Sequence, residues 1–89
     1  MQPGAIAVDE RRIVCFGDSV TQGTPHVPAA DTFPRLLERR FAQHKDKFGA
    51  LVCVFNAGEG GETSREGLAR FDQDVEAVAP HLVTVEFGL

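Results

Sequence analysis

A serine and a glycine-rich segment are the residues of this sequence best suited to carry out a reaction. Ser19 follows Gly17 and Asp18 at the end of an apolar run, and residues 56–61 read Asn-Ala-Gly-Glu-Gly-Gly. A serine hydroxyl attacks a carbonyl when a base removes its proton and hydrogen-bond donors stabilise the oxyanion that forms. Backbone N–H groups of a glycine-rich turn are suitable donors. Glycine at a strand-to-helix turn is also a common conformational requirement, so the spacing alone leaves both interpretations open.

Three apolar runs and two helical patterns must position these residues. Each run is typical of a strand buried on both faces of a parallel sheet, and each helical pattern places its apolar residues on one stripe. The alternation predicts the order β-α-β-α-β, an α/β fold of three layers with helices on both faces of the sheet. The predicted strands are 12–17, 50–55 and 82–87, and the two stripes contain Phe33, Leu36, Leu37, Phe41, His44 and Phe48, then Leu68, Phe71, Val75 and Val78.

Residues that favour helix ends frame both helical patterns. Asp31 or Thr32 can cap the first helix, and Gly49 is suited to end it. Thr63 and Glu66 have the spacing of a capping box, in which each side chain satisfies a free backbone N–H group of the other residue. The second helix is therefore expected to begin directly after the glycine-rich segment.

The carboxyl ends of the three predicted strands are expected to share one edge of the sheet. Ligands of open α/β sheets bind in the crevice at that edge. The loops that start at Gly17, Asn56 and Gly88 should therefore converge there. The first of them, residues 18–31, is long for a compact domain, and loops of this length are commonly functional.

The composition is that of one small soluble domain. The 89 residues include 13 acidic and 9 basic ones, for a net charge of −4, and 43% are hydrophobic. The negative charge argues against binding to nucleic acid or an anionic membrane, and no apolar run reaches the roughly 18 residues of a membrane span. We expect a single domain over 1–89 with a frayed terminus at 1–11, located in the cytoplasm, while a secreted mature form stays open. Cys15 and Cys53 lie in apolar runs and are expected to be buried free thiols.

Several other polar residues are weaker candidates. Asp18 could serve as a metal ligand or a carboxylate at a phosphoacceptor site, but a hydrogen bond to loop N–H groups is the favoured role. His26 lies seven residues after Ser19 and is a conceivable base. Glu59 and Glu62 are interpreted as solvated acids near the start of a helix. Glu86 interrupts an apolar strand, so if it is buried it should be paired or face a polar crevice.

Two segments resemble the conserved blocks of the SGNH/GDSL hydrolases. Residues 16–23, Phe-Gly-Asp-Ser-Val-Thr-Gln-Gly, are similar to the first block, which is Gly-Asp-Ser after a hydrophobic residue and before a further glycine. Residues 56–64 are similar to the second block, Asn-x-x-x-x-Gly-x-Thr-Ser. Residues 83–88 resemble the strand that leads into the third block, Gly-x-Asn-Asp, of which Gly88 is present. Two blocks in the correct order on the correct elements make a specific match.

The resemblance implies the N-terminal part of a serine esterase or lipase-like hydrolase that acts on carboxylic esters without a metal or cofactor. It implies a flavodoxin-like sheet with strand order 2-1-3. Ser19 would be the nucleophile, and its N–H and that of Gly61 would bind the oxyanion. The supporting residues would be Gly17, Asp18, Asn56 and Gly58.

The family's remaining catalytic groups do not occur in these 89 residues. The resemblance places a third oxyanion donor, an asparagine, at position 90, and takes the base and its orienting carboxylate from a later Asp-x-x-His block. Loss of a triad member commonly costs several orders of magnitude in turnover. We therefore expect negligible hydrolysis by this chain alone.

Two further expectations concern partners. The alternative function is a flavodoxin-like module that holds a phosphate or nucleotide at residues 56–63, although neither Gly-x-x-x-x-Gly-Lys nor Gly-x-Gly-x-x-Gly follows the first strand. In the order 2-1-3 the strand at 82–87 is an edge with the sequence of a central strand, which predicts self-association or weak stability. The ester substrate is a small molecule of unspecified identity.

Overall fold

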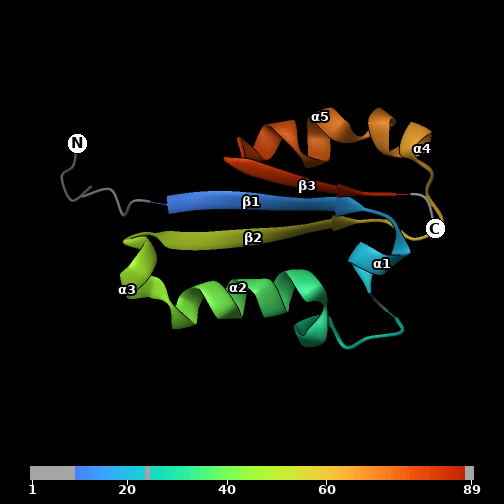
Figure 1. The fold of residues 1–89 in the computed structure, drawn as a ribbon. Helices are drawn as coiled ribbons and strands as arrows, with labels where there is room; N and C mark the ends of the chain where they lie inside the picture. Colours follow the sequence, from blue (N-terminus) through green and yellow to red (C-terminus); the bar gives the residue numbers. More distant parts are fainter. Residues whose placement is uncertain (1–9, 24, 88–89) are drawn as a thin grey trace.

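The computed structural model describes residues 10–23 and 25–87. Its strands and helices follow the predicted alternation, with additional short helical turns (Figure 1). In chain order the elements are β1 (Glu10–Gly17), α1 (Ser19–Gln22), η1 (Ala29–Asp31), α2 (Phe33–Gln43), α3 (Lys45–Phe48), β2 (Leu51–Gly58), α4 (Ser64–Ala69), α5 (Phe71–Asp74), η2 (Glu76–Val78) and β3 (Leu82–Glu86).

The three strands form a parallel sheet in the order β2-β1-β3, as the resemblance implied. Gly17 of β1 is level with Gly58 of β2 and with Glu86 of β3, so the carboxyl ends of all three strands meet at one edge. Helices α2 and α3 lie on one side of the sheet, α4 and α5 lie on the other, and α1 lies at the carboxyl edge (Figure 1). The predicted three-layer α/β fold is confirmed.

Successive residues of β1 face opposite layers and build two small cores. Ile13 and Cys15 pack with Val54 beneath α2, whereas Val14 and Phe16 pack beside α5. All four β1 residues are buried. This explains why the first strand has a continuous apolar run instead of an alternating one.

Both long strands extend beyond their predicted ends. β1 begins at Glu10, because the parallel ladder already pairs Glu10 with Leu51. Residues 10 and 11 were expected to be frayed, and that expectation was wrong. Residues 1–9 of the predicted frayed terminus lie outside the described residues. β2 continues past residue 55 to Gly58, since Asn56 pairs with Cys15. The second family-like block therefore starts within a strand.

The first helical pattern is interrupted near its end. The chain leaves helical geometry at His44, which separates α2 from α3. Thr32 occupies the N-cap position, but its hydroxyl donates to the carbonyl of Ala29 and does not cap an N–H group. Gly49 ends α3 in the left-handed conformation with φ of 60°, as predicted.

The second helical pattern is also divided, and the first loop contains helical turns. The predicted Thr63–Glu66 capping box is present at the start of α4. Arg70 then separates α4 from α5, and η2 follows. The segment expected to be a loop over residues 18–31 begins with α1 and ends with η1. The expectation of an irregular loop was wrong at both ends.

The two cysteines differ in exposure. Cys15 is fully buried, and burial raises the pKa of its thiol. Cys53 is partly exposed, so the prediction of a buried thiol was wrong there. Both are free. Among the described residues, no helix combines the length and apolarity that crossing a membrane requires.

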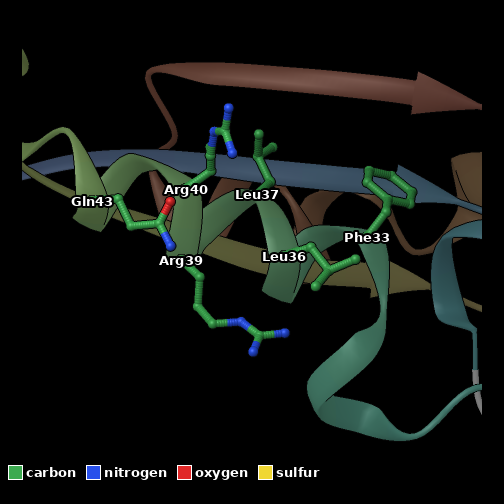
Figure 2. A pocket seen from close by; sticks show the side chains of 6 residues that line it. All are labelled: Phe33, Leu36, Leu37, Arg39, Arg40 and Gln43. Atoms are coloured by element: carbon green, nitrogen blue, oxygen red, sulfur yellow. The ribbon is translucent and has the colours of Figure 1, made fainter.

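Apolar side chains are exposed on β3 and on α2. Val85 is 66% exposed and Leu82 is 54% exposed. A groove of about 650 Å³ lies along α2, where Phe33, Leu37 and Arg40 project from one side of the helix (Figure 2). Exposed apolar surface next to an unpaired strand edge favours association between molecules.

We expect the chain to self-associate as its concentration rises, and Val85→Lys to reduce this association because a charge would be buried at the contact. Light scattering over a concentration series measures the mass of both proteins. A monomer that melts cooperatively at every concentration would contradict the expectation.

Candidate active site

Ser19 lies at the carboxyl end of β1, as the first residue of α1, and is exposed. Asp18 precedes it as the N-cap and is only 4% exposed. One Asp18 carboxylate oxygen accepts a hydrogen bond from Val20 N at 3.1 Å, and Asp18 N donates to the carbonyl of Glu86 at 3.2 Å. The bond to Val20 N is of the kind predicted for Asp18, and the role of Asp18 in presenting Ser19 stays a prediction.

The glycine-rich turn after β2 lies directly beside Ser19. Glu59 N donates to the carbonyl of Gly17 at 3.0 Å, and Gly60 N donates to Gln22 Oε1 at 2.7 Å. A Cβ placed on Gly60 would be 3.7 Å from the Cβ of Ser19. The next residue, Gly61, has a φ of 79°, and a Cβ placed on it would meet no atom within 4 Å beyond its chain neighbours. The structure thus brings the hydroxyl-bearing residue and the turn together.

Asn56 fastens α1 to the end of β2. Its Nδ2 donates to the carbonyl of Thr21 at 3.0 Å, and its Oδ1 accepts from Gly58 N at 2.9 Å. The same side chain therefore holds the backbone on both sides of the candidate site. Asn56 itself is exposed, so these bonds lie at the surface of the crevice.

Gly17 and Gly58 are glycines because other backbone or side-chain atoms occupy the space of a Cβ. A Cβ on Gly17 would lie 2.3 Å from Thr21 Oγ1, and one on Gly58 would lie 2.2 Å from Gln22 N. At Gly58 the obstacle is backbone, which cannot rotate away. These two residues let α1 approach both strand ends.

Arg70 is a site residue that the sequence did not reveal. Its guanidinium lies at the ends of β1 and β2 and forms an ion pair with Glu62 at 2.6 Å. Glu62 was expected to be solvated, and that expectation was wrong. Glu62 and Arg70 are eight positions apart in the sequence, which is not a helical pairing distance, so no local pattern could indicate the contact.

Glu86 brings a second carboxyl group to the same edge. Its Oε1 and the hydroxyl of Thr21 are buried and have no hydrogen-bond partner among the described residues. Burial raises the pKa of Glu86, and the neighbouring Asp18 carboxylate raises it further, while Thr21 acts in the opposite direction. Glu86 therefore lies beside polar groups, one of the two environments expected for it, and residues 10–23 and 25–87 give it no ion pair with a cation.

The remaining candidates of the sequence are His26, Gly88 and a metal site. His26 is exposed in the segment between α1 and η1. Gly88, the start of the third expected loop, lies outside the described residues. Within the described part of the chain, no group of three His, Cys, Asp or Glu side chains is arranged to hold a metal ion.

We expect Gly58→Ala to lower the free energy of unfolding by about 1–3 kcal/mol, because the added methyl group must displace the α1 backbone. Gly60→Ala is the control. Its Cβ would lie 2.8 Å from the flexible end of Gln22 and 3.7 Å from the Ser19 Cβ, an ordinary contact, and the substitution should cost less than about 1 kcal/mol. Urea unfolding followed by circular dichroism compares them. An equal decrease in the free energy of unfolding for both variants would contradict the close approach of α1 at Gly58.

We expect Glu86→Gln to stabilise the fold increasingly as the pH rises above 4.5, the ordinary pKa of glutamate. With a raised pKa, folded Glu86 keeps its proton where the unfolded chain has lost it, so stability falls as pH rises up to the folded-state pKa. Glutamine does not titrate, so the stability of the Glu86→Gln variant does not decrease with pH for this reason. Melting temperatures across pH measure the effect, with the exposed Glu76→Gln as control. Parallel profiles for wild type and Glu86→Gln would refute it.

Comparison with known proteins identifies the family. The sequence pattern of the GDSL-like lipase/acylhydrolase family matches residues 15–89. An arylesterase from Vibrio mimicus is 32% identical over 77 residues, a match that covers 86% of this chain and 36% of that protein.

Solved structures agree with this match. The lipase/acylhydrolase from Enterococcus faecalis has a TM-score of 0.72 and 35% identity, over 88% of this chain and 38% of that one. AlinE4, an SGNH-hydrolase family esterase, has a TM-score of 0.73 and 30% identity, over 90% of this chain and 41% of that one. This chain thus spans 36–41% of the length of these three relatives. Since the family pattern covers the segments carrying Ser19 and the glycine-rich turn, and the fold agrees, the chain belongs to the GDSL-like lipase/acylhydrolase family.

Proposed function

We propose that this chain is the N-terminal portion of a serine esterase in which Ser19 attacks carboxylic esters of acyl or acetyl type. The observation that carries the proposal is the 3.7 Å approach between the Ser19 Cβ and the Cβ position of Gly60. It puts an exposed hydroxyl beside a turn of backbone N–H groups at the carboxyl edge of a parallel sheet, where ligands of such sheets bind. Membership in a family of esterases and acylhydrolases supports it.

The N–H groups of Ser19 and Gly61 are proposed to bind the oxyanion. When Ser19 Oγ adds to the ester carbonyl, its proton passes to a base, negative charge develops on the carbonyl oxygen, and the alcohol later leaves with a proton. Donors fixed before the reaction stabilise that charge without reorganising. The N-cap at Asp18 and the hydrogen bond of Gly60 to Gln22 hold the two donor-bearing segments in place.

The general base is the missing part of this machinery. No Asp-x-x-His sequence occurs in the 89 residues, and His26 is exposed in the segment that follows α1. Without a base the hydroxyl stays protonated at neutral pH. We therefore propose that these residues supply the nucleophile and two oxyanion donors, and that further residues complete the catalyst. The phosphate- or nucleotide-binding alternative is not favoured by the comparisons.

The test compares the 89-residue chain with a longer chain that adds an asparagine at position 90 and an Asp-x-x-His block, using a short-chain aryl ester. We expect hydrolysis only by the longer chain, and a fall of about 10³–10⁴-fold on Ser19→Ala. Release of the chromogenic alcohol measures the rate. Ser19-dependent hydrolysis by the 89 residues alone would refute their inactivity. Full activity of Ser19→Ala in the longer chain would refute the assignment of the nucleophile.

A further inference from the structure

Arg70 connects the backbone segments on both sides of the candidate site. Its Nη2 donates to the carbonyl of Gly17 at 3.0 Å, and its Nη1 donates to the carbonyl of Ala57 at 3.0 Å. The guanidinium carbon also lies 4.7 Å from the centre of the Phe16 ring. One side chain from the α4–α5 junction therefore contacts the last residues of β1 and β2.

Two carboxylates balance the charge of this buried cation. Nε of Arg70 donates to Glu62 at 2.6 Å, and Nη1 donates to Asp74 at 3.1 Å. The Arg70 side chain is 15% exposed. Burial lowers its pKa, but the hydrogen bonds and charges of Glu62 and Asp74 outweigh this effect, and the pKa is raised. Arg70 stays charged, and its position is set by acceptors on several sides.

The two carboxylates lead to different parts of the molecule. Glu62 is adjacent to Gly61, so the Arg70–Glu62 pair holds the turn that carries a proposed oxyanion donor. Asp74 is the last residue of α5 and Arg70 is the N-cap of the same helix, so this ion pair links the two ends of α5. The Gly17 carbonyl bond fixes the other side, two residues before Ser19.

We propose that Arg70, acting through Glu62, is a positioning residue that sets the Gly61 N–H relative to the Ser19 hydroxyl during acyl transfer. The inference rests on the proposed esterase function. The planar guanidinium is required, because it alone offers donors in three directions at once, whereas a lysine ammonium at the end of a flexible chain cannot reproduce that fork. A shift of the donor away from the developing charge weakens transition-state binding and leaves ground-state binding largely intact.

The catalytic test uses the longer chain with its Asp-x-x-His block. We expect Glu62→Gln to lower kcat about tenfold and change KM less than about twofold, because the donor acts in the transition state. Asp74→Asn is the matched control: it removes an ion pair from the same guanidinium without touching the turn, and should leave kcat within about twofold. Equal kcat values for the two variants would overturn the inference.

A second readout does not depend on catalysis. In the 89-residue chain we expect Arg70→Lys to shift the amide NMR resonance of Gly61, nine residues away in sequence, and Asp74→Asn to leave it unchanged. An unmoved Gly61 resonance in Arg70→Lys would overturn the inference even if the longer chain hydrolyses esters. If the longer chain shows no hydrolysis, the proposed function fails, and the resonance still decides whether Arg70 positions the turn. If Arg70→Lys does not fold, the kcat values of Glu62→Gln and Asp74→Asn decide whether Arg70 positions the turn.

Discussion

The contact between the α1 backbone and the end of β2 is the constraint on which the candidate site depends. At Gly58 the Gln22 nitrogen occupies the place of a side chain, and at Gly17 the Thr21 hydroxyl does the same. Both strands must end at the same level for α1 to reach them, which the parallel register provides. The site is therefore built from backbone proximity, with few side chains at its centre.

Charged groups at the strand ends serve opposite purposes. Arg70 draws carbonyl and carboxylate oxygens together and so ties the segments. Asp18 and Glu86 bring two carboxyl groups to the turn that carries Ser19, where the raised pKa of Glu86 reflects the cost of burial beside Asp18. The Arg70 contacts lower the free energy of the folded state, whereas the Asp18–Glu86 pair is an unfavourable interaction within it. Carboxyl groups with shifted pKa values are common at functional sites.

Local patterns were sufficient for the order of the main elements and insufficient for their exact bounds and their contacts. The element order, the capping box that begins at Thr63 and the left-handed end at Gly49 follow from neighbours in sequence, and so could be predicted. The two family-like blocks predicted that Ser19 and the glycine-rich turn lie at the carboxyl edge of the sheet. The extension of β2 to Gly58 depends on pairing with β1, and the Arg70 contacts depend on where a helix junction lies over the sheet. These are long-range properties that periodicity cannot express.

The central place of β1 has a consequence for biosynthesis. β1 is synthesised before β2 and β3, yet these two strands fill its two hydrogen-bonding edges, and β3 ends only at Glu86. A nascent chain released from the ribosome as far as Gly58 can close one edge and must leave the other open, with the apolar β1 residues only half covered. Translation speed over the second helical region thus sets how long an aggregation-prone intermediate persists.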